Sequence, residues 1–409
     1  MADLTAKPRI RPVEAIPTND NGRPYFILRD PFHYSDAVLT LTPGAALIVQ
    51  LMDGANTILD IQTTLTRSGG EIFPSSKIEE ILKVLDECYF IDNERFQERK
   101  RRLEGEFARS AVRPAAMAGR SYPADARAVS DLLDKLFSQP DAAAVSAPAD
   151  GGSAVGVISP HIDFARGGTT YTPAYRALSG SDAETFVIFG ISHTGGSTPF
   201  IPTRKDFVTP LGTAETDRGL LDLLEKKLNG RPGLYESEFA HAHEHSIEFQ
   251  VVFLQYVLSK RRPFKILPIL CAFSHDEVDP DGASPVRTFL NALTAAIAES
   301  GRRAAYIAGV DFAHVGAQFG DTFAVREKEL SFLKQRDEQM MALLAAGGPG
   351  EFHRFISEES NSRRVCGYPA LYAFLSVLPK ENALDGRVLK YGQWPDPNGT
   401  VTFGSLSYG

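Results

Sequence analysis

Three histidines stand where short apolar segments of the chain end. His161 follows VISP, His193 follows FGIS, and Asp311 and His314 close AGVDFAH. The segments before them, such as residues 154–159, have the length and apolar character of buried strands. Imidazole nitrogens serve as general bases and are the commonest side-chain ligands of transition metals. The chemistry that this spacing offers is acid–base catalysis or metal binding.

The ends of these predicted strands are expected to meet. In open α/β sheets, ligands bind in the crevice beyond the carboxyl ends of the strands, and all three histidines belong there. Each one alone can equally be a hydrogen-bonded structural residue near a turn. Three of the nine histidines at equivalent positions favour one shared site instead. The sequence therefore predicts that His161, His193 and His314 line one crevice.

A further histidine cluster, AHAHEHSIEF, precedes a long apolar helical segment. Glu244 and His245 would lie at the N-terminus of that helix, where the partial positive charge favours an ionised Glu244 and a neutral His245. We assign both to the site as catalytic groups, together with Asp311 and His314. In this assignment His314, held by Asp311 or Glu244, is the general base. The two earlier histidines of the cluster are interpreted as part of a solvated capping segment: His241 and His243.

A thiol completes the set of candidate ligands. Cys366, in RRVCGYPALYAFLSVL, opens a predicted helix beside two arginines, and both features lower the pKa of a thiol. The alternative is a buried free cysteine, which is the role we assign to Cys271 at the end of FKILPILC. Two imidazoles and a thiolate suit iron, copper or zinc with one open position. The predicted metal ligands are therefore His161, His193 and Cys366.

The choice of metal decides between two kinds of chemistry. Iron or copper would support a redox reaction, whereas zinc would support hydrolysis. No nucleophile elbow, Walker loop or dinucleotide fingerprint stands in the chain, because glycine-bearing turns such as ARGGTT lack the required order after a strand. Nucleotide-binding and α/β-hydrolase functions are therefore disfavoured.

The elements that must position these groups alternate along the second part of the chain. A helix is predicted over 128–137 and a loop of small residues over 139–153. Continuous apolar runs then alternate with helical segments, which predicts strands that are covered on both faces. We expect an α/β sandwich with a mostly parallel central sheet over residues 112–409. Its predicted strands are 154–159, 185–192, 264–271 and 304–312, and its predicted helices are 219–228, 244–260 and 286–300.

The first 95 residues have a different organisation. A strand is expected over 24–30 and three short helices follow, capped by Thr42, Thr57 and Ser76, before a strand at 89–92. This order suggests a small winged-helix module. Between residues 39 and 94 nine acidic residues outnumber three basic ones, so DNA is an unsuitable ligand. The charged stretch 96–111 is expected to form a solvated linker helix.

The bulk composition limits the class of protein further. The 409 residues, 43% of them hydrophobic, are enough for two domains, and the net charge of −8 argues against a nucleic-acid partner. Three separate cysteines without C-x-x-C spacing indicate free thiols in a reducing compartment. Neither a signal peptide nor a run long enough to cross a bilayer is found. We expect a cytoplasmic protein with no membrane contact.

Seven motifs, in order along residues 113–409, resemble those of the Memo family, which in prokaryotes is called protein B of the AmmeMemoRadiSam system. They are AGRSYP (118–123), SPHID (159–163), FGISH (189–193), TPLGT (209–213), EHSIE (244–248), DFAH (311–314) and VCGY (365–368). Their shared order makes the resemblance specific. It implies a fold similar to that of class III extradiol dioxygenases, the non-haem iron enzymes that cleave catechol rings.

The resemblance also implies roles for individual residues. The metal-site residues of the family correspond to His161, His193 and Cys366. Extradiol dioxygenases bind iron through two histidines and a glutamate, so a cysteine in the third position implies metal binding and redox chemistry more directly than ring cleavage. Further pocket residues of the family correspond to Asp311 and His314, and the histidine of its EHSIE motif to His245.

Residues 24–95 resemble a second family, the PqqD-like winged-helix modules that bind leader peptides along an edge strand. The likeness is carried by TPGAALIVQLMDGANTILDI. It implies a peptide ligand for the N-terminal module, which suits its acidic composition. The system name of the Memo-like part implies a radical-SAM enzyme and an AMMECR1-like protein as partners.

These observations support three functional hypotheses. The first is a metal-dependent, dioxygenase-like oxidoreductase that acts with a radical-SAM partner on a peptide or small molecule. The second is a non-catalytic scaffold whose crevice and N-terminal module hold a peptide or partner without turnover. The third is a zinc hydrolase, whose activity would survive without oxygen.

Overall fold

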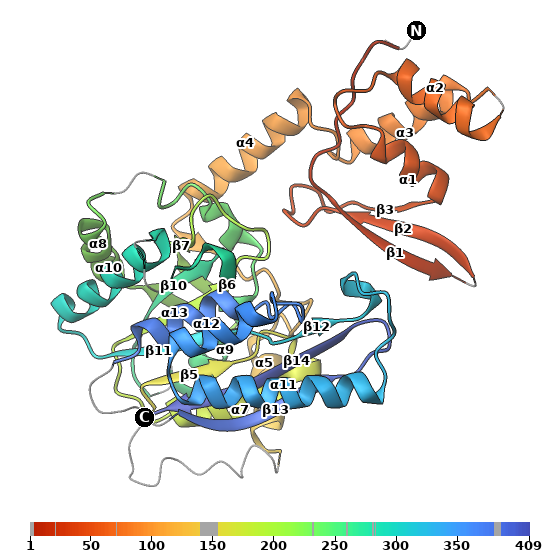
Figure 1. Ribbon diagram of the computed structural model, residues 1–409. Coiled ribbons are helices and arrows are strands. Elements are labelled where there is room, and N and C mark those ends of the chain that lie inside the picture. The colour runs from red at the N-terminus through yellow and green to blue at the C-terminus, as the bar shows by residue number, and fades with distance from the viewer. Residues whose placement is uncertain are drawn as a thin grey trace. The chain divides into compact units, whose positions relative to one another are not determined.

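The computed structural model describes residues 4–20, 22–70, 72–139, 154–230, 233–258, 261–279, 282, 284–379 and 386–409. The chain divides into two compact units, Met1–Arg109 and Ser110–Gly409, which are described separately (Figure 1). The loop of small residues predicted over 139–153 lies, apart from its first residue, outside the described residues. None of the helices in the described part of the chain combines the length and apolar character needed to span a bilayer.

The N-terminal unit combines a three-stranded antiparallel sheet with four helices in its described residues. The strands are β1 (Glu14–Asp20), β2 (Arg23–Arg29) and β3 (Val38–Leu41), in the order β1–β2–β3. The helices are α1 (Pro43–Gln50), α2 (Ile58–Gly69), α3 (Ser75–Glu87) and α4 (Glu94–Arg109). Thr42 caps α1 and Thr57 caps α2, as the sequence predicts. Apolar residues of the sheet and of α1–α3 form one core, which includes Leu28, Ile61 and Ile78.

Three details of this unit differ from the sequence prediction. The third helix begins at Ser75 with Pro74 at its N-cap, so the predicted Ser76 cap is wrong. The predicted strand at 89–92 is reduced to a single bridge between Ile10 and Ile91. The strands β1 and β3 were not predicted. The winged-helix assignment remains a prediction.

The charged stretch predicted as a linker forms α4 and packs on the N-terminal unit. The ring of Phe96 meets the ring of Tyr34 edge-on at 5.6 Å, and the Tyr34 hydroxyl donates a hydrogen bond of 2.6 Å to Glu104. Ion pairs such as Arg101–Glu94 occupy its solvated side. Although most residues of α4 are charged, one side of the helix packs on the N-terminal unit and the other faces solvent.

The α/β unit is built on one large sheet. Its strands lie in the order β12–β14–β5–β11–β6–β10–β9–β8–β4, with β13 on β14 and β7 on β10. The strands are β4 (Val112–Arg113), β5 (Gly156–Ser159), β6 (Thr185–Ile191), β7 (Phe200–Pro202), β8 (Asp206–Thr209), β9 (Gly212–Thr216), β10 (Lys265–Cys271), β11 (Ala304–Gly309), β12 (His314–Val315), β13 (Gly386–Trp394) and β14 (Thr400–Tyr408).

The centre of this sheet confirms the predicted fold class. The four predicted apolar strands are β5, β11, β6 and β10, and they pair in parallel in that order. Ser159 at the end of β5 pairs with Gly309 at the end of β11, so the carboxyl ends of these strands are level. The mixed architecture with a mostly parallel centre brings the segments after β5, β11 and β6 to one edge of the sheet.

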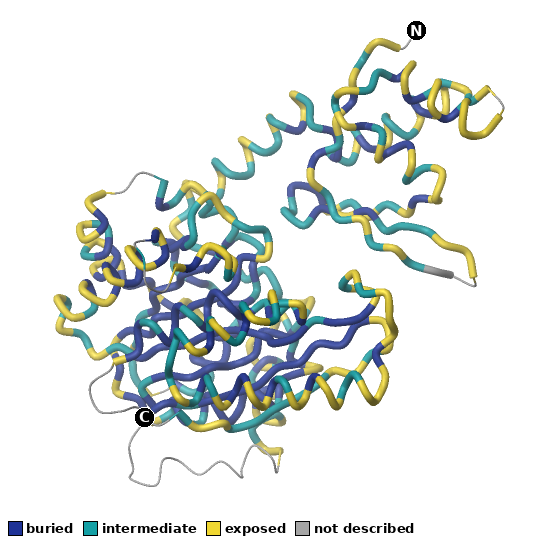
Figure 2. The backbone as a smooth tube through the Cα atoms, viewed as in Figure 1, coloured by how far each residue is buried: buried dark blue, intermediate teal, exposed yellow. Residues whose placement is uncertain are grey.

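Helices cover both faces of the sheet, as Figure 2 shows by the buried central strands. Val187 and Phe189 of β6 face a core that includes Phe374, whereas Phe186 and Ile188 face a core that includes Phe253. This alternation follows from the two-residue period of a strand. The helices are α5 (Ala126–Phe137), α7 (Phe164–Leu178), α8 (Arg218–Lys227), α9 (Ser246–Leu258), α10 (Pro285–Ser300), α11 (Glu327–Ala345), α12 (Pro349–Glu358) and α13 (Tyr368–Val377).

An antiparallel flank extends the parallel centre. Strand β14 pairs with β5 through Leu406–Tyr408 and with β12 through Val401 and Thr400. Strand β13 pairs with β14 from Gly386 to Trp394, with a shift of register between Val388 and Lys390. Eight of the nine residues of β14 are buried. The sequence TVTFGSLSY did not predict this strand, because Thr, Ser and Gly interrupt its apolar residues.

Candidate metal centre

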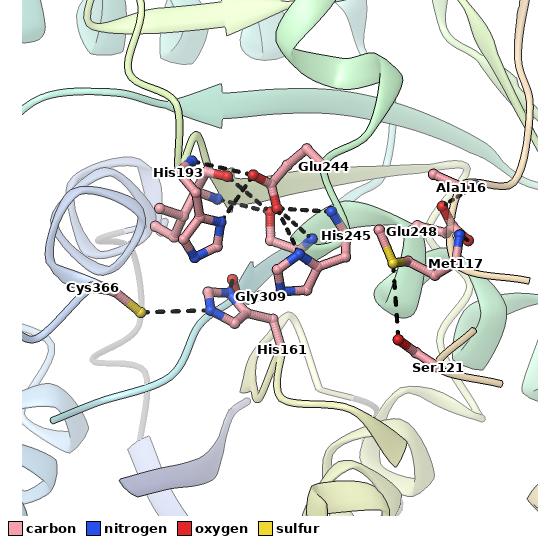
Figure 3. Close-up of polar contacts among 12 residues, drawn as sticks. Ala116, Met117, Ser121, His161, His193, Glu244, His245, Glu248, Gly309 and Cys366 are labelled. Carbon is pink, nitrogen blue, oxygen red and sulfur yellow. Dashed lines mark hydrogen bonds and ion pairs between the residues drawn. The ribbon is translucent and has the colours of Figure 1, made fainter. Parts of the chain in front are cut away.

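The segments that follow β5 and β6 and the turn before α9 bring three of the predicted histidines together. The ring centroids of His161 and His193 are 5.1 Å apart, and that of His245 lies 5.2 Å from His161 and 5.1 Å from His193. The rings of His193 and His245 are stacked, with 10° between their planes. The three imidazoles form a nearly equilateral triangle at the carboxyl edge of the sheet (Figure 3).

Cys366 reaches this triangle from the segment before α13. Its Sγ lies 3.5 Å from Nε2 of His161 and 3.7 Å from the carbonyl oxygen of Asp311. One donor atom each from His161, His193 and Cys366 lies within 4.8 Å of the other two. The structure thus brings together the three residues predicted as metal ligands.

Two glycines permit this close approach. A Cβ atom at Gly309 would stand 2.5 Å from the carbonyl oxygen of Ser246, and one at Gly367 would stand 2.6 Å from that of Asp311. Real Cβ atoms do not approach oxygen so closely, so neither position has room for a side chain. Gly309 lets α9 approach the sheet, and Gly367 lets the segment with Cys366 approach the end of β11.

The backbone before Cys366 adopts an uncommon conformation. Ser360, Asn361 and Arg364 have φ angles of 49°, 46° and 50°, in the left-handed region that residues with a side chain seldom occupy. Contacts hold this shape: Asn361 accepts a hydrogen bond of 2.8 Å from the amide of Val365, and Arg364 binds both carboxylate oxygens of Asp321. Strained backbone of this kind is concentrated at functional sites.

The orientation of His161 leaves one ring nitrogen for a ligand. Its Nδ1 lies 3.0 Å from the carbonyl oxygen of Gly309, which can only accept, so Nδ1 carries a proton and Nε2 faces Cys366. Asp311 holds the main chain at this point, because its Oδ1 accepts from the amides of His161 and Ile162 at 3.0 and 3.1 Å. Asp311 therefore positions His161.

Glu244 orients the other two histidines (Figure 3). Its Oε2 lies 2.9 Å from Nδ1 of His193, and its Oε1 lies 3.2 Å from Nδ1 of His245. It also accepts hydrogen bonds from the amides of His193, His245 and Ser246 at 3.2, 2.8 and 3.0 Å. A carboxylate that binds Nδ1 leaves Nε2 of each ring free, as behind the histidine ligands of metal sites.

The charges of the cluster follow from these contacts. Burial opposes ionisation of Glu244, but His193, His245 and the amides of the helix start outweigh it and bring its pKa well below the usual value. Burial also opposes protonation of His193, and Glu244 overrides it and raises that pKa well above 6.5. For His245 burial wins and lowers the pKa to about 3. The directions of both shifts are those predicted from the helix N-terminus, but burial causes the shift of His245, and the charges of His193 and His245 are the main causes of that of Glu244.

Cys366 and His161 form a second charged pair. Burial raises the pKa of the thiol, but His314 and His161 beside it lower that pKa well below 9.0. Burial lowers the pKa of His161, and Asp311 and Cys366 bring it to about 9. These shifts favour a thiolate at Cys366 beside a protonated His161, whose Nε2 lies 3.5 Å from Sγ. Thiolates are the form of cysteine that binds metals and attacks electrophiles.

The cluster is open to solvent at the stacked pair of His193 and His245, and Cys366 and His314 are half-buried. The side chain of His161 is 3% exposed, whereas those of His193 and His245 are 41% and 31% exposed. A small molecule or chain segment can therefore approach from the side of the stacked pair.

His314 also lies beside Cys366. Its Nδ1 is 3.2 Å from the carbonyl oxygen of Phe312, and its ring meets Phe319 edge-on at 5.1 Å. Burial lowers the pKa of His314, but the charge of Cys366 and a hydrogen bond to it raise it above the usual value. The charge of Asp311 adds to this rise in the pKa of His314, although none of the hydrogen bonds described for the ring joins it to Asp311 or Glu244.

Two predictions around the cluster have different outcomes. His241 was assigned to a solvated capping segment and this is wrong, because it is 1% exposed and its Nε2 donates to the carbonyl oxygen of Ile201 at 2.8 Å. Cys271 is fully buried in the apolar core at the end of β10, as the packing assignment expects. Arg113 and Glu248 form an ion pair and were not predicted as site residues, although Glu248 closes the EHSIE motif. The signal at Arg113 was a charged residue between apolar neighbours.

Comparison with known proteins supports the fold and the motifs. Residues 113–408 match the family model described as Memo-like protein. A MEMO1 family protein of Aquifex aeolicus is 26% identical over 385 residues, which are 94% of this chain and 94% of that protein. The MEMO1 family protein of Methanosarcina mazei is 30% identical over 288 residues, 70% of this chain and 94% of its own length. The MEMO1 family protein of Thermococcus kodakarensis is 34% identical over 223 residues, which are 54% of this chain and 71% of that protein.

The relatives differ in how much of the chain they match. The similarity to the Aquifex protein extends over nearly the whole of both chains, whereas the Methanosarcina protein is almost fully accounted for by 288 residues. The family model begins at residue 113, within three residues of the start of the α/β unit. The motifs, the fold and the match over this unit lead to one conclusion: the chain belongs to the Memo family.

Proposed function

We propose that this protein is a metal-dependent oxidoreductase whose centre consists of His161, His193 and Cys366, with iron or copper as the cation. The observation that carries the proposal is the convergence of one thiolate and two imidazoles within 4.8 Å. The Nδ1 atoms of both histidines are occupied by Gly309 and Glu244. Each ring therefore offers Nε2 to a shared cation.

The spacing of the donor atoms fits a metal. Bond lengths of about 2.3 Å to sulfur and about 2.05 Å to nitrogen, at a tetrahedral angle, place the two atoms about 3.5 Å apart. Sγ of Cys366 and Nε2 of His161 are 3.5 Å apart. Copper, iron and zinc bind thiolate and imidazole ligands, whereas magnesium and calcium prefer oxygen ligands. An iron or copper ion bound there would supply one-electron redox chemistry.

Residues around the proposed centre would handle protons and position its ligands. The proton that His161 shares with Cys366 must leave when a cation binds, so uptake of metal should release protons. His245 stands on the open side, and its low pKa keeps the ring neutral, so Nε2 can accept a hydrogen bond from a substrate. Glu244 orients the rings of His245 and His193 together. Asp311 supports the backbone of His161.

Metal analysis tests the proposal. The protein is purified without oxygen, and bound metal per chain is measured by mass spectrometry for the wild type and for His161→Ala, His193→Ala and Cys366→Ala. We expect about one iron or copper per wild-type chain and its loss in all three variants. Cys271→Ala is the matched control, because it removes a thiol that lies in the apolar core. Full occupancy in a His161→Ala, Cys366→Ala double variant would refute the proposal.

The N-terminal unit supports a second candidate, a peptide-binding scaffold. Strand β3 is an edge of its sheet, and Val38 on it is 63% exposed. An extended peptide can pair with such an edge. A radical-SAM enzyme or an AMMECR1-like protein would be the partner that brings this peptide. Partner binding that is lost without residues 1–109 but survives His161→Ala, with no turnover in the wild type, would favour the scaffold over the enzyme.

A further inference from the structure

A buried ion pair stands behind the turn that carries Glu244 and His245. The side chains of Arg113, in β4, and Glu248, in α9, are both fully shielded from solvent and in direct contact. The guanidinium also lies over the ring of Phe207, 5.1 Å from its centre. Figure 3 shows Glu248 beside the histidine cluster. None of the roles considered so far uses this pair.

Glu248 binds the segment of the AGRSYP motif. Its carboxylate accepts hydrogen bonds from the amides of Ala116 and Met117 at 2.9 and 3.0 Å, and from the hydroxyl of Tyr122. With Arg113 as a fourth partner, both carboxylate oxygens are satisfied without water. Glu248 thereby fixes Arg113 with respect to α9.

Arg113 directs its other donors at the turn itself. Its Nε donates to the carbonyl oxygen of His241 at 2.8 Å, and its second terminal nitrogen donates to that of Glu244 at 2.5 Å. The planar guanidinium thus spans the turn from one end to the other. Lysine, with a single nitrogen, could not make these contacts together.

A fully buried ion pair is a poor source of stability, because apolar residues of similar size often serve as well. What this pair contributes is the fixed direction of its hydrogen bonds. One donor of Arg113 binds the carbonyl of Glu244, and the donors that bind Glu248 and the carbonyl of His241 fix the direction of that bond. The carboxylate of Glu244 in turn defines the orientation of His193 and His245. The chain of contacts from Arg113 to the two rings is therefore continuous.

We propose that Arg113 is a positioning residue of the metal centre: by clamping the His241–Glu244 turn, it places the Glu244 carboxylate that sets the ring orientation of His193 and His245. The proposal rests on the proposed metal centre for its functional meaning. The orientation of the rings, however, can be measured without metal.

The test compares two buried arginines in the full-length protein. Arg113→Gln removes the clamp. Arg11→Gln is the matched control, because Arg11 is equally buried, pairs with Asp30 and lies 5.3 Å from the ring centre of Phe90, but belongs to the N-terminal unit. With ¹⁵N-labelled histidine, long-range ¹H–¹⁵N spectra of the metal-free protein show which ring nitrogen carries each proton, and alanine variants assign His193 and His245.

We expect the Nδ1-protonated signals of His193 and His245 to shift or disappear in Arg113→Gln and to stay unchanged in Arg11→Gln. Arg113→Lys keeps the positive charge but loses the planar set of N–H donors, and should also change the signals of His193 and His245. Wild-type signals for both histidines in either folded Arg113 variant would overturn the proposal, even where the other variant fails to fold. A cobalt(II) titration is run in parallel, with affinity expected to be about 10- to 100-fold weaker in Arg113→Gln.

The two measurements separate the two proposals. If the wild-type protein binds no metal, the proposed function fails, while the histidine spectra still decide the role of Arg113. If the wild type binds metal and Arg113→Gln retains both its affinity and its histidine signals, only the role of Arg113 fails.

Discussion

Replacing Glu244 by glutamine should weaken the candidate metal centre without removing any of its ligands. The amide has the shape of the carboxylate but keeps only one acceptor oxygen. If the new NH₂ group takes the place of Oε2, it faces the amide and Nδ1 of His193, and both are donors. If it takes the place of Oε1, it faces the amides of His245 and Ser246. In either orientation the new NH₂ group faces N–H donors, so hydrogen bonds are lost.

The magnitude follows from the number and exposure of these contacts. A buried donor without an acceptor costs about 1–3 kcal/mol. The ring of His193 is 41% exposed, so water can replace one of the lost bonds. We therefore expect the free energy of unfolding to fall by about 2 kcal/mol. Removing a carboxylate behind histidine ligands typically weakens metal binding by about 10- to 100-fold, which is the effect expected here.

Two assays measure these quantities. Urea denaturation gives the free energy of unfolding, and competition with a chromophoric chelator gives the dissociation constant for cobalt(II) or copper(II). Glu236→Gln is the control, since Glu236 is exposed on the preceding loop. Metal affinity within about threefold of the wild type, together with unchanged stability, would refute the argument that Glu244 supports the centre.

Three other outcomes are expected. Gly367→Ala should destabilise the fold by about 1–3 kcal/mol or more, because the added methyl group overpacks the site. Gly350→Ala should stabilise the fold by up to about 1 kcal/mol, because Gly350 lies in α12 with open space around it. Urea denaturation measures both effects. Burial holds the pKa of His241 at about 3 in the folded chain. The unfolded chain therefore binds the proton at residue 241 first as the pH falls below about 6.5, so His241 should lower the free energy of unfolding by about 2 kcal/mol by pH 5. The loss of stability between pH 6.5 and 5 should be smaller by this amount in His241→Gln than in the wild type, as urea denaturation at each pH would show. Removal of residues 1–109 should leave metal affinity unchanged, because every candidate ligand lies in Ser110–Gly409; a chelator titration that shows weaker binding would contradict this.

The sequence was informative where one local rule decides the structure. Apolar runs that end in SPHID, FGISH and DFAH predicted both the parallel strands and the place of their histidines, because carboxyl ends of parallel strands share one edge. The caps at Thr42 and Thr57 were predicted because capping depends on a few neighbouring residues.

The sequence was uninformative where distant segments decide. His241 stands in a polar, alternating stretch and was predicted to be solvated, yet Arg113 and β7 cover it. Nothing in EHSIE shows that one carboxylate would serve both His193 and His245, since that depends on how the turn before α9 meets the end of β6. The strand β14 was missed because its burial comes from pairing with β5 and β13 rather than from an apolar sequence.

The long sequence separation between the ligands has a consequence for how the protein is made. His161 and Cys366 are 205 residues apart, and β5, which leads to His161, is flanked by β14 from beyond residue 400. Such contacts form late, since a large loop must close before they contribute. During synthesis, therefore, no fragment that lacks these distant segments contains the complete cluster. A metal bound at the proposed centre would be acquired only after the segment with Cys366 and strand β14 have left the ribosome.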